Sequence, residues 1–164
     1  MDELKKALDI SVSGIVREQA LNAFETQLKR WQIAMPPMDR LVLDFGLGDF
    51  DRIGLIECWI ANEFDAGYCG KFLFVFEGQT CPMHMHKDKH ETFYILKGTV
   101  QMIYGEEHRK MKQGDTLAVS QLIKHSFTGV QGPALLLEIS KPCLIDDNYF
   151  SDTRIPIGGN YKTQ

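Results

Sequence analysis

The stretch from Gly78 to Gly98 constrains this chain more than any other part of its sequence. It places two histidines, His84 and His86, two residues apart and a carboxylate, Glu91, five residues further on. Side chains at positions i and i+2 of a strand point to the same face, so both imidazoles can reach one point in space. The polar residues after them turn the chain, which lets Glu91 return on a neighbouring strand. Two imidazoles and a carboxylate are good ligands for a divalent transition metal, so the sequence predicts a metal site.

The cysteines offer one alternative ligand. The chain has four of them, Cys58, Cys69, Cys81 and Cys143, without the paired spacing of a zinc site or a redox motif. We therefore expect reduced thiols in a cytoplasmic protein. Cys81 precedes His84 by three residues and could be a soft ligand, but strand parity places it on the opposite face.

Length and charge exclude several classes of partner. A chain of 164 residues fits one domain with a substantial core. No apolar run approaches the roughly 20 residues of a membrane span. The polar N-terminus does not predict a secretory signal. The net charge of −4, with scattered Lys and Arg, gives no electrostatic case for nucleic acid.

The first part of the chain carries a helical pattern. Apolar residues recur with the period of one helix face from Val16 to Trp31 and predict a helix there. Pro36 and Pro37 end any helical continuation. We therefore expect an N-terminal helical segment, residues 1–37, that packs on the rest of the fold.

The remainder, residues 38–164, reads as short β-strands separated by turn residues. The runs that predict strands are 41–44, 55–60, 71–76, 91–96, 99–104, 109–112, 116–119, 125–130 and 134–140. Close spacing without helices between the strands predicts a sandwich or a barrel. The tail from Pro142 is polar and irregular but keeps Tyr149, Phe150, Ile155 and Ile157, so we expect it to fold back over the domain.

A third histidine extends the metal pattern. His125 follows Gly114 by eleven residues and lies in a predicted strand. The first stretch resembles the first motif of the cupin family in full: glycine, five residues, His-x-His, four residues, glutamate, six residues, glycine. Gly114 and His125 resemble the second cupin motif. The chain departs from that motif at Ser120, Leu122 and Gly129, where a proline, a glycine and an asparagine are usual.

The cupin resemblance implies a fold and a ligand set. The fold is mainly β, a single-domain antiparallel β-barrel of jelly-roll form, here with an N-terminal helix. The implied metal ligands are His84, His86, Glu91 and His125. We expect Mn²⁺, and Fe²⁺, Co²⁺, Ni²⁺ and Zn²⁺ also fit the set. His90 and His108 do not fit the motif and are expected to be solvated. Cupins commonly pair, which implies a homodimer.

A closer resemblance, to the cupin-type D-lyxose isomerases, covers most of the chain from about Leu41 onward. It rests on residues 44–48, 68–71, 78–82 and 151–155, the last matching an Asp-x-Arg-Ile segment of that family. An active-site lysine of the family precedes the first metal histidine by thirteen residues, which is the position of Lys71. The family's second active-site glutamate matches Glu138, thirteen residues after His125.

The residues alone leave the roles of Lys71 and Glu138 open. Lys71 could be a solvated strand end, and Glu138, in an apolar run, could be a rim carboxylate or part of a salt bridge. The resemblance implies that Glu138 is the base and that Lys71 holds a substrate hydroxyl or stabilises negative charge. It also implies that Asp152 and Arg154 close the mouth of the site and bind distal hydroxyls.

Together these features predict a metal-dependent aldose–ketose isomerase for a free sugar, of the D-lyxose/D-xylulose or D-mannose/D-fructose type. The metal polarises the carbonyl, and a carboxylate moves a proton between C1 and C2 through a cis-enediol. A hydride shift and a phosphorylated substrate stay open. So do two other functions of the cupin fold, an Fe²⁺ dioxygenase and a non-catalytic sugar-binding protein.

Overall fold

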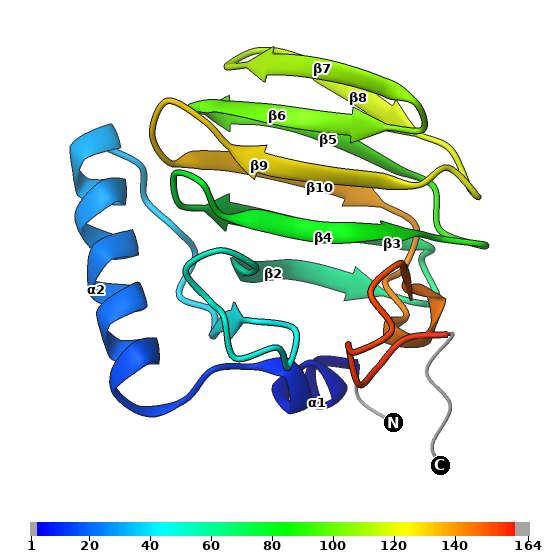
Figure 1. Cartoon of the computed structure of the whole chain (residues 1–164), viewed down its shortest axis with the longest axis horizontal. Coiled ribbons are helices and arrows are strands. Elements are labelled where there is room, and N and C mark those ends of the chain that lie inside the picture. Colours follow the sequence, from blue (N-terminus) through cyan, green and yellow to red (C-terminus); the bar gives the residue numbers. More distant parts are fainter. Residues whose placement is uncertain (1–2, 160–164) are drawn as a thin grey trace.

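Two antiparallel β-sheets face each other in this computed structural model, which describes residues 3–159 (Figure 1). The helices are α1 (Glu3–Ala7), the 3₁₀ helix η1 (Leu8–Ile10), α2 (Gly14–Trp31) and the 3₁₀ helix η2 (Ile145–Asp147). The strands are β1 (Arg40–Leu43), β2 (Leu55–Glu63), β3 (Tyr68–Val75), β4 (Thr80–Met85), β5 (Glu91–Lys97), β6 (Thr99–Tyr104), β7 (Glu107–Lys112), β8 (Thr116–Val119), β9 (His125–Gly129), β10 (Ala134–Ser140) and β11 (Tyr149–Phe150).

The strand order confirms the predicted jelly roll. One sheet has the order β1-β2-β3-β10-β5-β8 and the other β11-β4-β9-β6-β7. Because side chains alternate along a strand, each sheet turns one set inward. The two inward sets form one core, to which Val75, Phe93 and Ile95 contribute from the first sheet and Val100, Met102 and Phe127 from the second. The metal-binding motif therefore lies on strands that are covered on their inner side.

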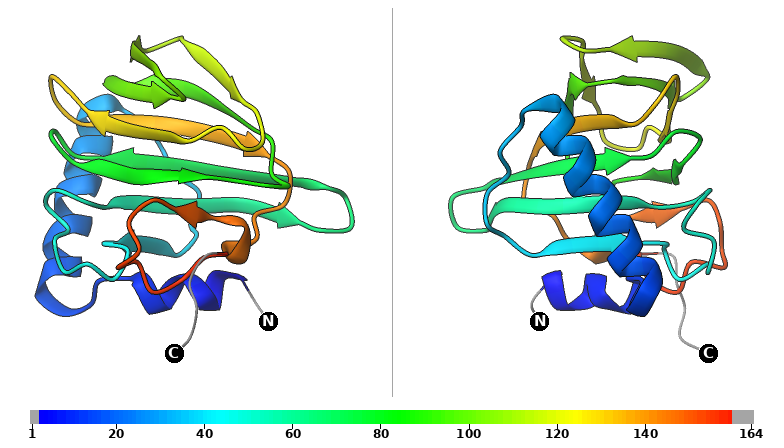
Figure 2. Two further views of the ribbon diagram at one scale, coloured as in Figure 1. Left: turned by 45° about the vertical axis from the view of Figure 1, so that its right-hand side comes forward. Right: turned by 90° about the vertical axis from the view of Figure 1, so that its left-hand side faces the viewer.

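Helix α2 covers part of the outer face of the six-stranded sheet (Figure 2). Its buried positions Ala20, Phe24 and Leu28 belong to the stripe that the sequence predicted. The Phe24 ring meets Phe74 of β3 edge-on, with 5.0 Å between the ring centroids. No helix in the described part of the chain has both the length and the apolar character needed to cross a membrane. The boundary between residues 37 and 38 stays a prediction.

The two ends of the described chain meet at one end of the sandwich (Figure 2). The sequence pattern did not predict α1. Its Glu3 carboxylate accepts a hydrogen bond from the backbone N–H of Ile145 at 2.6 Å. Lys6 Nζ lies 2.7 Å from a carboxylate oxygen of Asp146. The tail folds back as expected, and β11 pairs with β4. We call residues 3–10 together with 143–157 the terminal cap.

Candidate metal centre and active site

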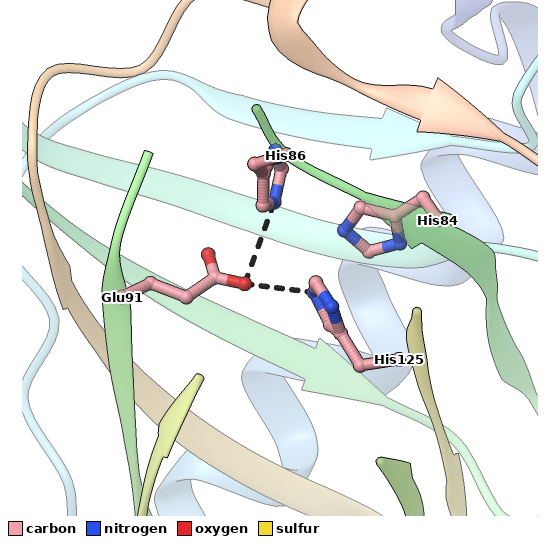
Figure 3. Close-up of side chains that lie close together, drawn as sticks. All are labelled: His84, His86, Glu91 and His125. Carbon is pink, nitrogen blue, oxygen red and sulfur yellow. Dashed lines mark ion pairs between the residues drawn. The ribbon is translucent and has the colours of Figure 1, made fainter. Parts of the chain in front are cut away.

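The four predicted metal ligands converge between the two sheets (Figure 3). His84 lies in β4 and His86 directly follows that strand. His125 begins β9 and is the antiparallel partner of His84, which brings the two rings to a centroid distance of 4.3 Å. Glu91 begins β5 in the opposite sheet and faces the rings. One potential ligand atom from each residue lies within 4.8 Å of the others.

Backbone carbonyls fix the orientation of the three imidazoles. His84 Nδ1 lies 2.8 Å from the Pro82 carbonyl oxygen. His86 Nδ1 lies 3.0 Å from that of Asp147, and His125 Nδ1 lies 3.0 Å from that of Ile123. A carbonyl oxygen only accepts hydrogen bonds, so each Nδ1 is assigned the proton. Each Nε2 then keeps a free lone pair, as metal coordination requires.

The buried atoms at the centre fit a metal ion. Glu91 Oε1 lies 2.7 Å from His125 Nε2 and 3.4 Å from His86 Nε2. Among the described residues, none of these three atoms has a partner in hydrogen-bonding geometry. Buried polar atoms rarely lack a hydrogen-bond partner, because each unsatisfied group costs about 1–3 kcal/mol of stability. A divalent cation would satisfy all three at once, and nitrogen and oxygen donors of this kind suit it.

The protonation states of these residues favour a cation. Burial and the neighbouring histidines hold the pKa of His84 well below its usual value. Burial and the Lys89 ammonium lower the pKa of His86. Burial by itself raises the pKa of Glu91, but Lys89 and the imidazoles outweigh it, and the net pKa is well below the usual value. Near neutral pH His84 and His86 are therefore neutral imidazoles and Glu91 is an ionised carboxylate.

Glu138 and Lys71 face the same interior. Both are buried, with 3% and 4% of their surface exposed, so Lys71 is not a solvated strand end. Lys71 Nζ lies 3.6 Å from Glu138 Oε2. A second lysine, Lys89, bridges the ligand and the proposed base, because its Nζ lies 2.7 Å from Glu91 Oε2 and 2.9 Å from Glu138 Oε1. Burial raises the pKa of Glu138, but the two ammonium groups lower it further than burial raises it.

A further carboxylate, Glu57 of β2, lies beside this group. It accepts a hydrogen bond from Trp59 Nε1 at 2.6 Å and lies 3.8 Å from Lys71 Nζ. The cavity at the metal site is about 40 Å³, and a second of the same size shares Glu57, Lys71 and Asn148 with it. The terminal cap lines the second cavity. Cavities of this size hold a few water molecules rather than a sugar.

The structure does not bring Asp152 and Arg154 to these cavities. They pair with each other at 2.6 Å, and the Arg154 side chain is 73% exposed. Neither lines either cavity. The pair lies on the outer part of the tail. The expected contact of Asp152 and Arg154 with the distal hydroxyls of a substrate therefore stays a prediction.

Strand parity failed at Cys81, which is buried and lines the metal-site cavity together with His84. The β4–β9 register shifts between these two residues, so both face inward although they have opposite parity. Pro82 lies in the shifted segment and has no N–H to donate to a regular ladder. Cys81 is not among the four grouped ligands, and His90 and His108 are exposed as predicted.

The second motif keeps its turn despite its unusual residues. Leu122 stands where a glycine is usual and still adopts a left-handed backbone, with φ of 64°. Its N–H donates to the His86 carbonyl at 2.7 Å, so the turn supports a metal ligand directly. At this position the chain differs from the cupin motif in residue type, but its backbone keeps the left-handed conformation that a glycine would adopt.

Comparisons with known proteins agree with this site. The cupin domain family model matches residues 72–140, which include all four ligands and Glu138. The D-lyxose isomerase family model matches residues 38–104. The D-lyxose/D-mannose isomerase of Thermosediminibacter oceani is 28% identical over 158 aligned residues, covering 78% of this chain and 86% of that protein.

Solved structures share the fold at low sequence identity. The L-ribose isomerase of Cellulomonas parahominis in complex with L-ribose superimposes with a TM-score of 0.71 and 14% identity, covering 90% of this chain and 96% of that one. The L-ribose isomerase of Geodermatophilus obscurus gives 0.70 and 14%, covering 87% and 94%. The chain thus resembles the cupin domain family over residues 72–140 and the D-lyxose isomerases over residues 38–104, as its motifs predicted.

Proposed function

We propose that this protein is a metal-dependent aldose–ketose isomerase that moves a proton between C1 and C2 of a free sugar. One observation carries the proposal: a buried ionised carboxylate, Glu138, is separated from the ligand Glu91 by the single ammonium group of Lys89. A metal held by Glu91 would supply an electrophile on one side of Lys89, and Glu138 would supply a base on the other, in a water-poor interior. This is the arrangement that proton transfer next to a carbonyl requires.

The contacts of Glu138 favour one of its two oxygens as the proton acceptor in this proposal. Its Oε1 accepts hydrogen bonds from Lys89 Nζ and Ser140 Oγ, both at 2.9 Å. Its Oε2 has only the longer contact to Lys71, at 3.6 Å. Oε2 is therefore the better placed to remove the proton from C2 and to return it to C1 of the cis-enediol.

The two lysines have different roles. Lys89 holds Glu138 and Glu91 in place, since it contacts an oxygen of each. Lys71 stabilises negative charge that develops on the substrate oxygens, and it can pass a hydroxyl proton between them. Burial lowers the pKa of each ammonium, but neighbouring acidic groups raise it further, Cys143 and Glu138 at Lys71 and Glu138 and Glu91 at Lys89, so both stay protonated near neutral pH.

His84, His86, Glu91 and His125 would hold the metal. When bound, a divalent cation acts as a Lewis acid on the sugar carbonyl. We propose Mn²⁺, because a mixed nitrogen and oxygen ligand set without thiolates suits a hard, redox-inert ion.

The substrate class is a small aldose of the D-lyxose or D-mannose type, supported by the named activity of the T. oceani relative. The end of the sugar far from the metal would face Glu57 and Asn148, which line both cavities. Since these cavities are too small for a sugar, the terminal cap has to move for substrate to enter.

We further propose a cytoplasmic homodimer. All four cysteines are unpaired and buried, which supports a reducing compartment. The outer face of the six-stranded sheet beyond α2 exposes Ile60, Tyr68 and Ile139 around Gly70, at 39%, 50% and 58%. An apolar patch of this kind suits a subunit contact. Light scattering of the wild type and of Ile139→Lys tests it.

An anaerobic assay of the Mn²⁺-loaded protein on a panel of pentoses and hexoses tests the function. We expect one aldose to be converted to its ketose, with deuterium from D₂O entering carbon, and activity to vanish with chelator. Glu138→Gln should lower kcat by about 10²–10⁴-fold. Ser140→Ala is the matched control, because it removes one hydrogen bond to Oε1 and leaves Oε2 unchanged. Full activity of Glu138→Gln, or a reaction that consumes oxygen, would contradict the proposal.

A further inference from the structure

The turn between β4 and β5 carries residues of the site at both of its ends. His86 stands at its start, and Lys89 and Glu91 stand at its close. The middle of the turn, Lys87 and Asp88, is exposed and has no helix or strand hydrogen bonding of its own. Something outside the turn therefore has to fix its shape.

One buried carboxylate, Asp147 of η2, organises this turn. Its Oδ1 accepts hydrogen bonds from the backbone N–H of Lys87 at 2.9 Å and of Asp88 at 3.2 Å. Its Oδ2 accepts from Asp88 at 3.2 Å and from Lys89 at 2.9 Å. Asp147 is 7% exposed, so these charge-assisted bonds lie largely out of water, where they are strong.

The main chain of Asp147 reaches the metal site as well. Its carbonyl is the group that accepts the Nδ1 hydrogen bond of His86, at 3.0 Å. The residue thus holds a metal-binding ring with one group and the amide of Lys89 with another. Among the described contacts of the turn, no other side chain accepts a hydrogen bond from three successive amides.

We propose that Asp147 is a positioning residue that preorganises the metal-binding turn and sets the metal affinity of the site. It is not among the four grouped ligands and lines neither cavity. It acts through His86, Lys89 and the backbone between them. Partners that orient metal ligands typically change affinity about 10- to 100-fold when they are removed. This inference rests on the proposed metal-dependent function.

The first test is metal affinity, measured by competition between the protein and a metallochromic chelator for Mn²⁺. Asp147→Asn keeps the size of the side chain but faces the turn amides with an NH₂ group, which cannot accept. We expect its dissociation constant for Mn²⁺ to rise about 10- to 100-fold. The matched control is Asp146→Asn, an adjacent carboxylate that is 71% exposed and pairs with Lys6. We expect that variant to stay within about twofold of the wild type.

The second test needs no variant. The amides of Lys87, Asp88 and Lys89 in the metal-free wild type should exchange with D₂O at least about tenfold more slowly than that of Glu106, in the exposed turn between β6 and β7. Fast exchange at all three amides would overturn the proposal even if Asp147→Asn failed to fold. So would an unchanged dissociation constant in Asp147→Asn, or an equal rise in Asp146→Asn. If the wild type bound Mn²⁺ tightly but did not isomerise any sugar, the proposed function would fail and this inference would stand.

Discussion

Replacing Lys89 with methionine tests the electrostatic design of the site most directly. Three buried or nearly buried carboxylates, Glu57, Glu91 and Glu138, face two ammonium groups, Lys71 and Lys89. The formal charge of this group is therefore −1 without a metal and +1 with a divalent cation. Lys89→Met makes these charges −2 and 0. The substitution should therefore lower the free energy of unfolding of the metal-free protein more than that of the metal-bound protein.

The distances give the size of the effect. Lys89 Nζ lies 2.7 Å and 2.9 Å from two carboxylate oxygens. At an effective dielectric constant of about 20, each such pair attracts by about 6 kcal/mol, and the desolvation of the ammonium offsets much of it. Removing one partner of a buried pair typically costs about 3–5 kcal/mol. We expect that loss in chelator, and about half of it when a cation compensates Glu91.

Thermal unfolding with excess chelator and with saturating Mn²⁺ measures both values. For a chain of this size the loss in chelator corresponds to a fall in Tm of about 6–20 °C. Lys87→Met is the matched control, since Lys87 is exposed and its ammonium lies 4.2 Å above the Tyr149 ring. It should cost less than about 1 kcal/mol. Equal losses with and without metal, or a loss no larger than that of Lys87→Met, would refute the charge argument.

The remaining predictions concern the ligands, the substrate, the pH dependence and the core. His125→Ala should weaken Mn²⁺ binding by at least about 100-fold, measured by chelator competition. Glu57→Gln should raise KM more than it lowers kcat, because Glu57 faces the far end of the substrate; steady-state kinetics on the best sugar separates the two effects. Burial raises the pKa of Glu138 and Lys71 lowers it, so Lys71→Met should move the acid limb of the kcat/KM profile to higher pH. Phe24→Ala should lower the free energy of unfolding by about 3–5 kcal/mol in urea titrations, since the ring is 1% exposed.

The fold was predictable because its strands have clear periodicity and turn residues. Glu91, Phe93 and Ile95 alternate with Thr92, Tyr94 and Leu96, which predicts a strand with two distinct faces, and the structure buries the first set. The first ten residues were not predictable in this way. Helix α1 is too short for a repeating pattern, and it is held by contacts with residues near the other end of the chain.

The site residues were predictable only where they belong to a motif with fixed spacing along the chain. Spacing identified the four ligands, and the resemblance to the D-lyxose isomerases singled out Lys71 and Glu138, whose roles the residues alone had left open. Lys89 was missed because it lies in a turn, where sequence gives no side-chain direction. Glu57 was missed because a single carboxylate on a strand has no motif. Asp147 was missed because its role depends on contacts across about 60 residues of chain.

The terminal cap also has a consequence for the order of folding. The hydrogen bond from Ile145 to Glu3 joins residues 142 positions apart, and η2 also carries Asp147, which shapes the metal-binding turn. Contacts of such long range carry a large loop-closure cost and form late. On the ribosome, the turn can acquire its final shape only after nearly the whole chain has been synthesised. A nascent chain would therefore bind metal only weakly until η2 has docked.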